Sequence, residues 1–334
     1  MSIHWYPGHM HKAQKEIREL LPQVDLLIEV LDARIPYSSE NPAIAAIRGE
    51  KPCIKVLSKS DLADPEVTAI WQAHLEQERG VKTFTTTTEQ PQKMKQIIDL
   101  CRKMLPEKEA SIKTINTMIC GIPNVGKSTL INILAERIVA KTSNEPAVTK
   151  AQQRINLGSG IILFDTPGIL WPKVENPQSS YRLATTGAIK DTAMEYDDVG
   201  FFAADYLIKA YPELLKERFK LEYIPDTEIE FLEMAAAQRG ALRAGGRVNL
   251  HKICEVLVNE FRSGKLGRIS LETPEMVLKE EAEMAAAELK KAEEKAQRKE
   301  RFKTGSLTRD KKAQKEHRIE RVQRRSKEKQ ASKK

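Results

Sequence analysis

Short apolar runs of strand length alternate with amphipathic stretches of helical length through the first half of the chain. These runs, one of them rich in threonine, predict strands at residues 24–30, 53–57, 82–86, 114–120 and 161–164. Helical spacing of apolar residues predicts helices up to about residue 21 and at residues 65–79, 93–104 and 127–137. Because strands alternate with helices, we expect right-handed β-α-β crossovers, a mostly parallel sheet and an α/β fold class.

The pattern changes beyond Pro177, where strand-like runs disappear. Residues 181–217 and 228–263 have helical spacing, and the helical pattern is broken at Pro212, Pro225 and Gly245-Gly246. We therefore expect a small all-α domain after the sheet. Beyond it, residues rich in Ala, Glu and Lys predict a solvated helix, and the final basic stretch has too few apolar groups to fold alone.

The charge is concentrated at the C-terminal end. The 334 residues carry a net charge of +8, but residues 290–334 contain 19 Lys/Arg and 7 Asp/Glu, a net of +12. Residues 1–289 therefore carry a net of −4. A basic arm of this kind is a common device for binding polyanions, and the alternative is a tail that only improves solubility.

The four cysteines are scattered and form no C-x-x-C pair, which argues against a structural zinc site and a disulfide framework. The N-terminal residues contain no apolar signal core, and no run of about 18 apolar residues occurs in the chain. We therefore expect a cytoplasmic protein that does not enter a membrane.

The most specific motif is the sequence GIPNVGKS at residues 121–128, which fits the phosphate loop G-x-x-x-x-G-K-[ST]. It lies between a predicted strand and a predicted helix, so its backbone N–H groups can surround a phosphate. Lys127 would add charge between the β- and γ-phosphates and act in catalysis, and the Ser128 hydroxyl would bind Mg²⁺. The predicted nucleotide contacts in this loop are Asn124, Val125, Gly126, Lys127, Ser128 and Thr129.

A second motif, Asp165-Thr166-Pro167-Gly168, follows the next apolar strand. Asp165 would hold Mg²⁺ through water, and the Gly168 N–H would sense the γ-phosphate. Thr149 lies between the two motifs and is the candidate for a catalytic switch threonine that reaches Mg²⁺ when the γ-phosphate is present; Thr142 is its nearest rival.

The guanine-reading element belongs after these motifs in most GTP-binding domains, but its candidate here, Ser58-Lys59-Ser60-Asp61, lies upstream. Asp61 would accept hydrogen bonds from guanine N1–H and N2–H, and Lys59 would lie along the base. This order predicts a circularly permuted P-loop GTPase that binds GTP and GDP. Thr86 is the candidate for the last base contact, although its segment matches that motif poorly.

Ser58 departs from the asparagine that usually opens the guanine motif. Serine is shorter and lacks the amide that ties the base loop to the phosphate loop. We therefore expect this substitution to affect nucleotide affinity more than the choice of guanine.

These features together resemble the RbgA/YlqF group of circularly permuted ribosome-assembly GTPases. The resemblance covers about residues 3–273 and rests on the permuted order and on WYPGHM (5–10), DARIP (32–36), DTPGI (165–169) and RSGKLG (262–267). Besides Ser58, the departures are Ala147 where glycine is usual, the threonine-rich base-loop segment and the long basic extension. The predicted domains are a permuted GTPase domain (1–176), a helical RNA-binding domain (177–274) and a charged extension (275–334).

The resemblance implies a role in maturation of the large ribosomal subunit, with GTP hydrolysis stimulated by that particle. Ile169 stands where many GTPases place a water-orienting glutamine, and the resemblance points to His9 as the substitute. An imidazole can orient or polarise a water molecule. The alternative is that His9 only caps the first helix.

Asn124 also resembles the potassium ligand of cation-dependent GTPases. A bound K⁺ would place a fixed positive charge between phosphates. The alternative is an asparagine that only shapes the loop.

The resemblance further implies that the helical domain binds RNA. Its candidate contacts are Arg239, Arg243, Arg247, Arg262, Lys265 and Arg268. A solvated face without a partner would have a similar sequence. The basic extension has almost no aromatic residues, with only Phe302, so we expect rRNA or a pre-ribosomal particle to be recognised by shape and charge. We expect the protein to be monomeric.

A different class of function is an RNA-binding scaffold with a weak or degenerate nucleotide site. Ser58 and the poor base-loop match keep this alternative open, while the intact set of Lys127, Ser128 and Asp165 argues against it. No second catalytic constellation supports an enzyme that acts on a small molecule.

Overall fold

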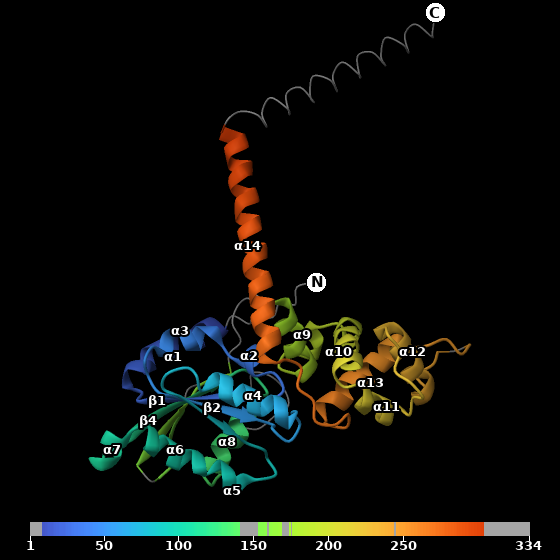
Figure 1. The fold of residues 1–334 in the computed structure, drawn as a ribbon. Helices are drawn as coiled ribbons and strands as arrows, with labels where there is room; N and C mark the ends of the chain where they lie inside the picture. Colours follow the sequence, from blue (N-terminus) through green and yellow to red (C-terminus); the bar gives the residue numbers. More distant parts are fainter. Residues whose placement is uncertain are drawn as a thin grey trace, which may run out of the picture. The chain divides into compact units, whose positions relative to one another are not determined.

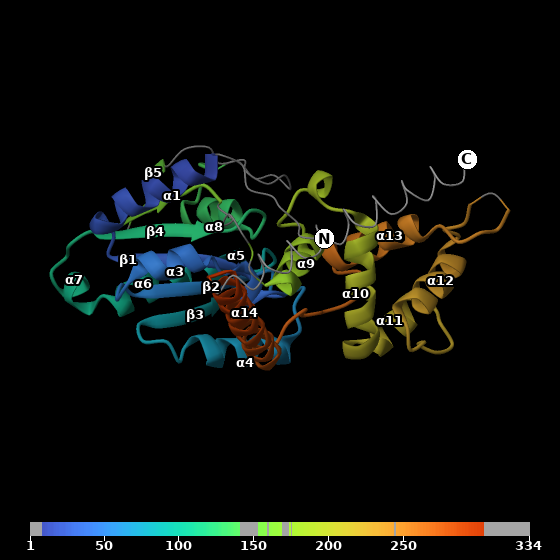
Figure 2. The same cartoon turned by 90° about the horizontal axis from the view of Figure 1, so that it is seen from above.

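A six-stranded sheet forms the centre of the first part of the chain. The computed structural model describes residues 9–140, 153–158, 160–168, 174, 176–243 and 245–303, with side chains from residue 15 to residue 300. The strands are β1 (Leu26–Asp32), β2 (Cys53–Ser58), β3 (Val81–Thr85), β4 (Ile115–Gly121), β5 (Gln153–Asn156) and β6 (Ile161–Asp165). Their order is β3-β2-β1-β4-β6-β5, and Figure 2 shows β4, β1, β2 and β3 side by side.

The predicted mostly parallel sheet is confirmed. All neighbouring strands run parallel except β5, which pairs antiparallel with β6 at the edge. Strand β5 was not predicted, because only Ile155 of its four residues is buried and the strand has no apolar alternation. In β1 and β2 every residue is buried, as expected for central strands of a parallel sheet.

The helices around the sheet are α1 (His9–Leu20), η1 (Leu21–Gln23), α2 (Pro36–Ser39), α3 (Pro42–Arg48), α4 (Pro65–Leu75), α5 (Pro91–Met94), α6 (Gln96–Met104), α7 (Pro106–Ala110) and α8 (Lys127–Leu134). Right-handed crossovers place α3 on one face of the sheet and α6 and α8 on the other (Figure 1). The single helix predicted at residues 93–104 is two helices, α5 and α6, which meet at Lys95.

Local signals set the beginnings of several helices. Asn41 and Asp64 accept hydrogen bonds from backbone N–H groups of the first turns of α3 and α4. Proline follows each of these residues, at the first helical position, where its missing N–H costs nothing.

The chain is helical after the sheet, from Pro177 onward, as predicted. It contains α9 (Pro177–Thr186), η2 (Asp191–Ala193), α10 (Tyr196–Ala210), α11 (Pro212–Phe219), α12 (Glu228–Arg239) and α13 (Leu250–Arg262). The close packing of α10 on α13 depends on Gly200, because a Cβ there would lie 2.4 Å from the Cβ of Cys254. Any larger side chain would force the two helices apart.

The chain divides into two compact units, Met1–Val277 and Leu278–Lys334. Helix α14 (Pro274–Lys303) begins in the first unit and continues in the second. Among the described residues, no helix is long and apolar enough to cross a membrane.

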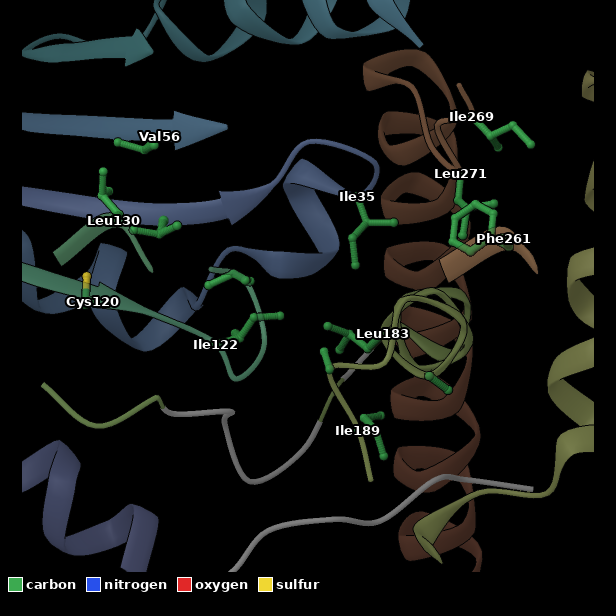
Figure 3. Close-up of a cluster of buried hydrophobic side chains, with 14 of the residues drawn as sticks. Ile35, Val56, Cys120, Ile122, Leu130, Leu183, Ile189, Phe261, Ile269 and Leu271 are labelled. Atoms are coloured by element: carbon green, nitrogen blue, oxygen red, sulfur yellow. The ribbon is translucent and has the colours of Figure 1, made fainter. Parts of the chain in front are cut away.

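One hydrophobic core runs from the sheet into the helical region of the first unit. Figure 3 shows part of this cluster, in which Ile35 and Ile122 come from the sheet region and Leu183 and Phe261 come from α9 and α13. All four side chains are buried. The helical region is therefore packed against the end of the sheet that carries the predicted nucleotide motifs.

Candidate functional site

The permuted order of motifs predicted from the sequence is present in the structure. The base-reading segment follows β2, the phosphate loop follows β4, and the Asp165 motif ends β6. Because β2, β1, β4 and β6 are parallel neighbours, these three segments all begin at the carboxyl ends of the strands, on the same edge of the sheet. The carboxyl ends of the strands are where nucleotides bind in open α/β sheets.

The phosphate loop has the backbone that its glycines predict. A Cβ on Gly121 would lie 2.6 Å from the Val30 carbonyl oxygen, so the loop can leave β4 this close to β1 only with glycine. Gly126 has φ +90° and precedes the first turn of α8, which begins at Lys127. Asn124 is also left-handed, with φ +61°. The loop therefore turns the positive end of α8 toward a phosphate site.

Lys127 and Asp165 form a buried ion pair, in which the ammonium group donates to Oδ1 of the carboxylate. Burial raises the pKa of Asp165, and the Lys127 charge opposes this shift. The other carboxylate oxygen, Oδ2, is buried without a hydrogen-bond partner among the described residues. An orphaned carboxylate oxygen beside the phosphate loop fits a cation site, since a buried acceptor of this kind needs a partner.

The residues after Asp165 lie directly against the phosphate loop. The Thr166 hydroxyl donates to the Ile119 carbonyl oxygen over 2.8 Å and fixes the start of the segment. A Cβ on Gly168 would lie 3.3 Å from the Cα and the nitrogen of Pro123. The Gly168 backbone thus approaches the phosphate loop closely, as a sensor of the γ-phosphate requires.

The expectation that Ser58 lacks a tie to the phosphate loop is wrong. Its hydroxyl lies within hydrogen-bond distance of the Val125 carbonyl oxygen and, at 2.8 Å, of the Leu31 carbonyl oxygen. The Ser58 Cβ lies 3.9 Å from the position of a Cβ on Gly126, so a short side chain is long enough here. The serine keeps the connection between base loop and phosphate loop that the sequence analysis assigned to asparagine alone.

Beside the base loop, Asp32 accepts two hydrogen bonds from the Arg34 guanidinium, over 2.9 and 2.7 Å, and pairs with the Lys59 ammonium over 3.0 Å. Burial would raise the pKa of Asp32, but these two cations hold it well below its ordinary value. Arg34 also lies over the Phe261 ring of α13, 5.0 Å from its centroid. Asp32 and Arg34 entered the sequence prediction only as family markers. The signal of a structural role was the presence of charged residues at the end of a fully buried strand and just beyond it.

Asp61 and Thr86, the other predicted base contacts, are brought together by backbone pairing. The Ser60 N–H donates to the Thr86 carbonyl oxygen over 3.1 Å, and the Thr86 N–H donates to Leu57 over 2.9 Å. Asp61 is half-buried and has no hydrogen-bond or ion-pair partner in the part of the chain that the structure describes. Its carboxylate is therefore available to a ligand.

Three predicted positions lie outside the described residues. They are Thr149, its rival Thr142 and Ile169. His9 is the first residue of α1, but its side chain is not described.

Comparisons with known proteins agree with this geometry. Residues 116–222 match the family described as "50S ribosome-binding GTPase". The chain is 44% identical to Ribosome biogenesis GTPase A of Bacillus pumilus, over 82% of this chain and 100% of that protein. It is 31% identical to the Thermotoga maritima protein of the same name, over 81% and 94%. The structure of GNP-bound YlqF from T. maritima matches with a TM-score of 0.55 and 28% identity, over 79% of this chain and 99% of that one.

The chain belongs to the ribosome biogenesis GTPase A family. The resemblance stated from its motifs is thereby confirmed, as are the P-loop GTPase fold and the enzymatic activity, hydrolysis of GTP. The nucleotide ligands are therefore GTP and GDP.

In this GTPase the residues of the cation site fit Mg²⁺. Ser128 stands at the first turn of α8 with a hydroxyl, and Asp165 presents its unpartnered Oδ2. Hydroxyl and carboxylate oxygens are the ligands that Mg²⁺ prefers. For Asn124 the structure shows a protein contact, because its side-chain amide donates to the Gly187 carbonyl oxygen over 2.8 Å.

Three of the six cations predicted to bind RNA are engaged within the GTPase itself. Arg262 donates to the carbonyl oxygens of Ala184 and Thr185, and Arg268 donates to those of Ser60 and Ala63. Arg239 contacts Glu260 and the carbonyl oxygen of Arg218, and lies over the ring of Phe219. The remaining three, Arg243, Arg247 and Lys265, are exposed, as Arg239 and Arg268 are, but their side chains make no hydrogen bond or ion pair with the described residues.

Proposed function

We propose that this GTPase acts on the large ribosomal subunit or its precursor and that its nucleotide state controls its contact with rRNA. The observation that carries the proposal is the hydrogen bond from Asn124 of the phosphate loop to Gly187, the residue that ends α9. A change at the phosphates therefore has a direct path to the helical region. The names of the relatives refer to ribosome biogenesis and the description of the matching family refers to 50S binding, and both support the choice of particle.

Nucleotide binding would use the edge of the sheet described above. Lys127 and the amides of the phosphate loop would hold the β- and γ-phosphates, and Ser128 and Asp165 would hold Mg²⁺, which neutralises phosphate charge when bound. Thr129 and Val125 would add contacts along the loop, and Gly168 would sense the γ-phosphate. Because Lys127 pairs with Asp165, the ammonium would shift from the carboxylate toward the phosphates when nucleotide and metal bind.

Guanine would be read by Asp61, with Lys59 beside the base and Thr86 at the rim. The Lys59 ammonium is already fixed by Asp32, so its side chain is held in place before the base arrives. Burial lowers the pKa of Lys59, and Asp32 opposes the shift.

For hydrolysis we propose that His9 orients the attacking water, that Thr149 completes the metal site, and that K⁺ binds beside Asn124. The support for these roles is that in this chain the apolar Ile169 follows the switch glycine, and that DTPGI and GIPNVGKS are among the motifs that resemble the family.

RNA contact would be concentrated on the connection between α12 and α13. This segment forms a short antiparallel pairing between Leu242 and Val248, with the exposed Arg243 and Arg247 at its turn. Figures 1 and 2 show the connection projecting beyond both helices. Gly245 and Gly246 carry no side chain to keep a phosphate away. In this proposal Arg239, Arg262 and Arg268 support the structure rather than touch RNA, and the protein works as a cytoplasmic monomer.

The test is GTP turnover by the full chain with and without large ribosomal subunits. Stimulation by the particle, absent with small subunits, is the expected result. Equal turnover without particles, with small subunits and with large subunits would show a GTPase that does not act on this partner. If the protein bound no nucleotide at all, the alternative of an RNA-binding scaffold would gain support. A variant without Arg243 and Arg247 should lose stimulation while its intrinsic rate is retained.

A further inference from the structure

The loop that carries Asp61 is held by the segment that returns from the helical region to the sheet. We call residues 264–272 the return segment. Arg268 in this segment donates from Nε to the Ala63 carbonyl oxygen over 3.0 Å and from Nη2 to the Ser60 carbonyl oxygen over 3.1 Å. One guanidinium thus bridges two backbone carbonyls, one on each side of Asp61.

Further contacts of the return segment follow the same loop. The Ile269 N–H donates to the Leu62 carbonyl oxygen over 2.9 Å, and the Asp64 N–H donates to the Ser270 hydroxyl over 3.2 Å. Both of these contacts fall within three residues of Asp61. The loop is therefore bound along its length by a segment more than 200 residues later in the chain.

The fit is also steric. Gly264 has φ +72°, and a Cβ on it would lie 2.6 Å from Cδ2 of Leu62, the residue directly after Asp61. The return segment therefore lies directly against the loop from its first residue onward.

The Asp61 side chain is the exception in this loop. Its neighbours Ser60, Leu62 and Ala63 are fixed by backbone hydrogen bonds, but its own carboxylate has no partner among the described residues. The return segment thus fixes the backbone of the loop and leaves the Asp61 carboxylate available. This arrangement presents the carboxylate to a ligand. Fixing a loop in its bound conformation lowers the entropy cost of binding.

We propose that Arg268 is a positioning residue for base recognition, which holds the loop so that Asp61 meets the guanine edge. This inference rests on the proposed role of Asp61 as the guanine reader. In this chain, guanine selectivity thus depends on a residue from the segment that follows the helical region in the sequence. Loss of Arg268 should weaken the contacts to the base and leave the contacts to the phosphates unchanged.

The experiment compares the affinities of GDP, IDP and XDP for the full-length protein and four variants. IDP lacks the guanine N2 amino group, so the ratio of GDP to IDP affinity reports the Asp61 contact alone. A hydrogen bond to a charged group corresponds to about a tenfold ratio or more in the unmodified protein. In Arg268→Ala this ratio should fall about three- to tenfold toward one, and Arg268→Lys, which keeps a donor and the charge, should recover part of it. Arg79→Ala removes an exposed arginine whose side chain makes no hydrogen bond to this loop, and it should leave the ratio unchanged.

The variant Asp61→Asn separates the two proposals. If it shifts preference from GDP to XDP while Arg268→Ala keeps the full GDP to IDP ratio, the role of Arg268 is refuted and that of Asp61 stands. If Asp61→Asn binds GDP as before, the base assignment itself is refuted. A parallel loss of GDP and IDP affinity in Arg268→Ala would show a general structural effect and would also refute the positioning role.

Discussion

The side-chain amide of Asn124 donates a hydrogen bond to the Gly187 carbonyl oxygen over 2.8 Å and so joins the phosphate loop to the end of α9. Gly187 has φ +81° and terminates that helix. On the other side, Arg262 at the end of α13 donates to the Ala184 and Thr185 carbonyl oxygens. The phosphate loop, α9 and α13 therefore form one chain of contacts, through which the proposed nucleotide-dependent change in the loop would reach the helical region.

Potassium dependence tests whether Asn124 also serves a cation. Replacing K⁺ by Na⁺ at constant ionic strength should slow GTP hydrolysis, because screening is then unchanged and only the specific ion differs. The variant Asn124→Ala should have similar rates in both salts. Equal rates in the unmodified protein would rule out a potassium ion beside the phosphates and would leave Asn124 its contact with Gly187.

Separate roles are expected for Lys127 and His9. Lys127→Ala should lower affinity for GTP, because it removes the cation that faces the phosphates and leaves the buried Asp165 without its partner. His9→Ala should keep that affinity and slow single-turnover hydrolysis with ribosomal particles by about 10²–10⁴-fold, the usual contribution of a positioned acid–base group. A His9→Ala protein that hydrolyses GTP at the unmodified rate would reduce this residue to a structural role.

Much of the nucleotide site could be predicted because its backbone requirements appear as residue types. Gly121 and Gly126 are needed for close approach and positive φ, and they stand at fixed spacing from Lys127. The Ser58 contact could not be predicted, because the distance between two loops decides whether a short hydroxyl replaces an amide. Local spacing gave the helices of the second half correctly but not the partners of their side chains.

Buried ion pairs between distant segments were equally invisible in the sequence. Glu272 is fully buried, accepts hydrogen bonds from the Ser38 N–H and hydroxyl, and lies 3.3 Å from Nη1 of Arg182. These residues are separated by 90 or more positions, so no periodicity relates them. The same holds for Arg268, which the sequence analysis assigned to RNA and the structure shows against the base loop.

Stability should fall as pH rises because of Glu29, a buried residue in the centre of the sheet. Burial and the nearby Glu40 raise the pKa of Glu29 to about 8, against the attraction of Lys55 and Arg48. Between about pH 4.5 and 8 the folded protein therefore holds a proton that the unfolded chain releases. The free energy of unfolding should drop across this window by up to about 1.4 kcal/mol per pH unit from this group.

Urea unfolding of the full chain at several pH values measures this slope. Glu29→Gln keeps an acceptor for the Asn41 N–H and should flatten the slope, whereas Glu50→Gln, at an exposed position, should not. An unchanged slope in Glu29→Gln would assign the pH dependence to other groups.

A division of labour is expected between the basic extension and the helical region in binding the ribosomal particle. Residues 290–334 carry a net charge of +12, and the described side chains from 290 to 300 are exposed, so the loss of these described side chains removes charge without removing packing. For every phosphate that the extension neutralises, its deletion should reduce the salt dependence of binding by about one unit of slope. The shortened protein should therefore bind more weakly and with a flatter salt slope.

The ratio of affinities with GTP and with GDP should survive this deletion, because the contacts that join the phosphate loop to α9 and α13 lie entirely within residues 1–277. Asn124→Ala gives the matched opposite case: it keeps the extension and should lower the ratio, since it removes the link to Gly187. Binding of each protein to large subunits, measured across a salt series with GDP and with a non-hydrolysable GTP analogue, yields both quantities. A ratio that falls to one in the deletion while the remaining chain stays folded would make the extension part of the switch, and the path through Asn124 would then be the wrong one.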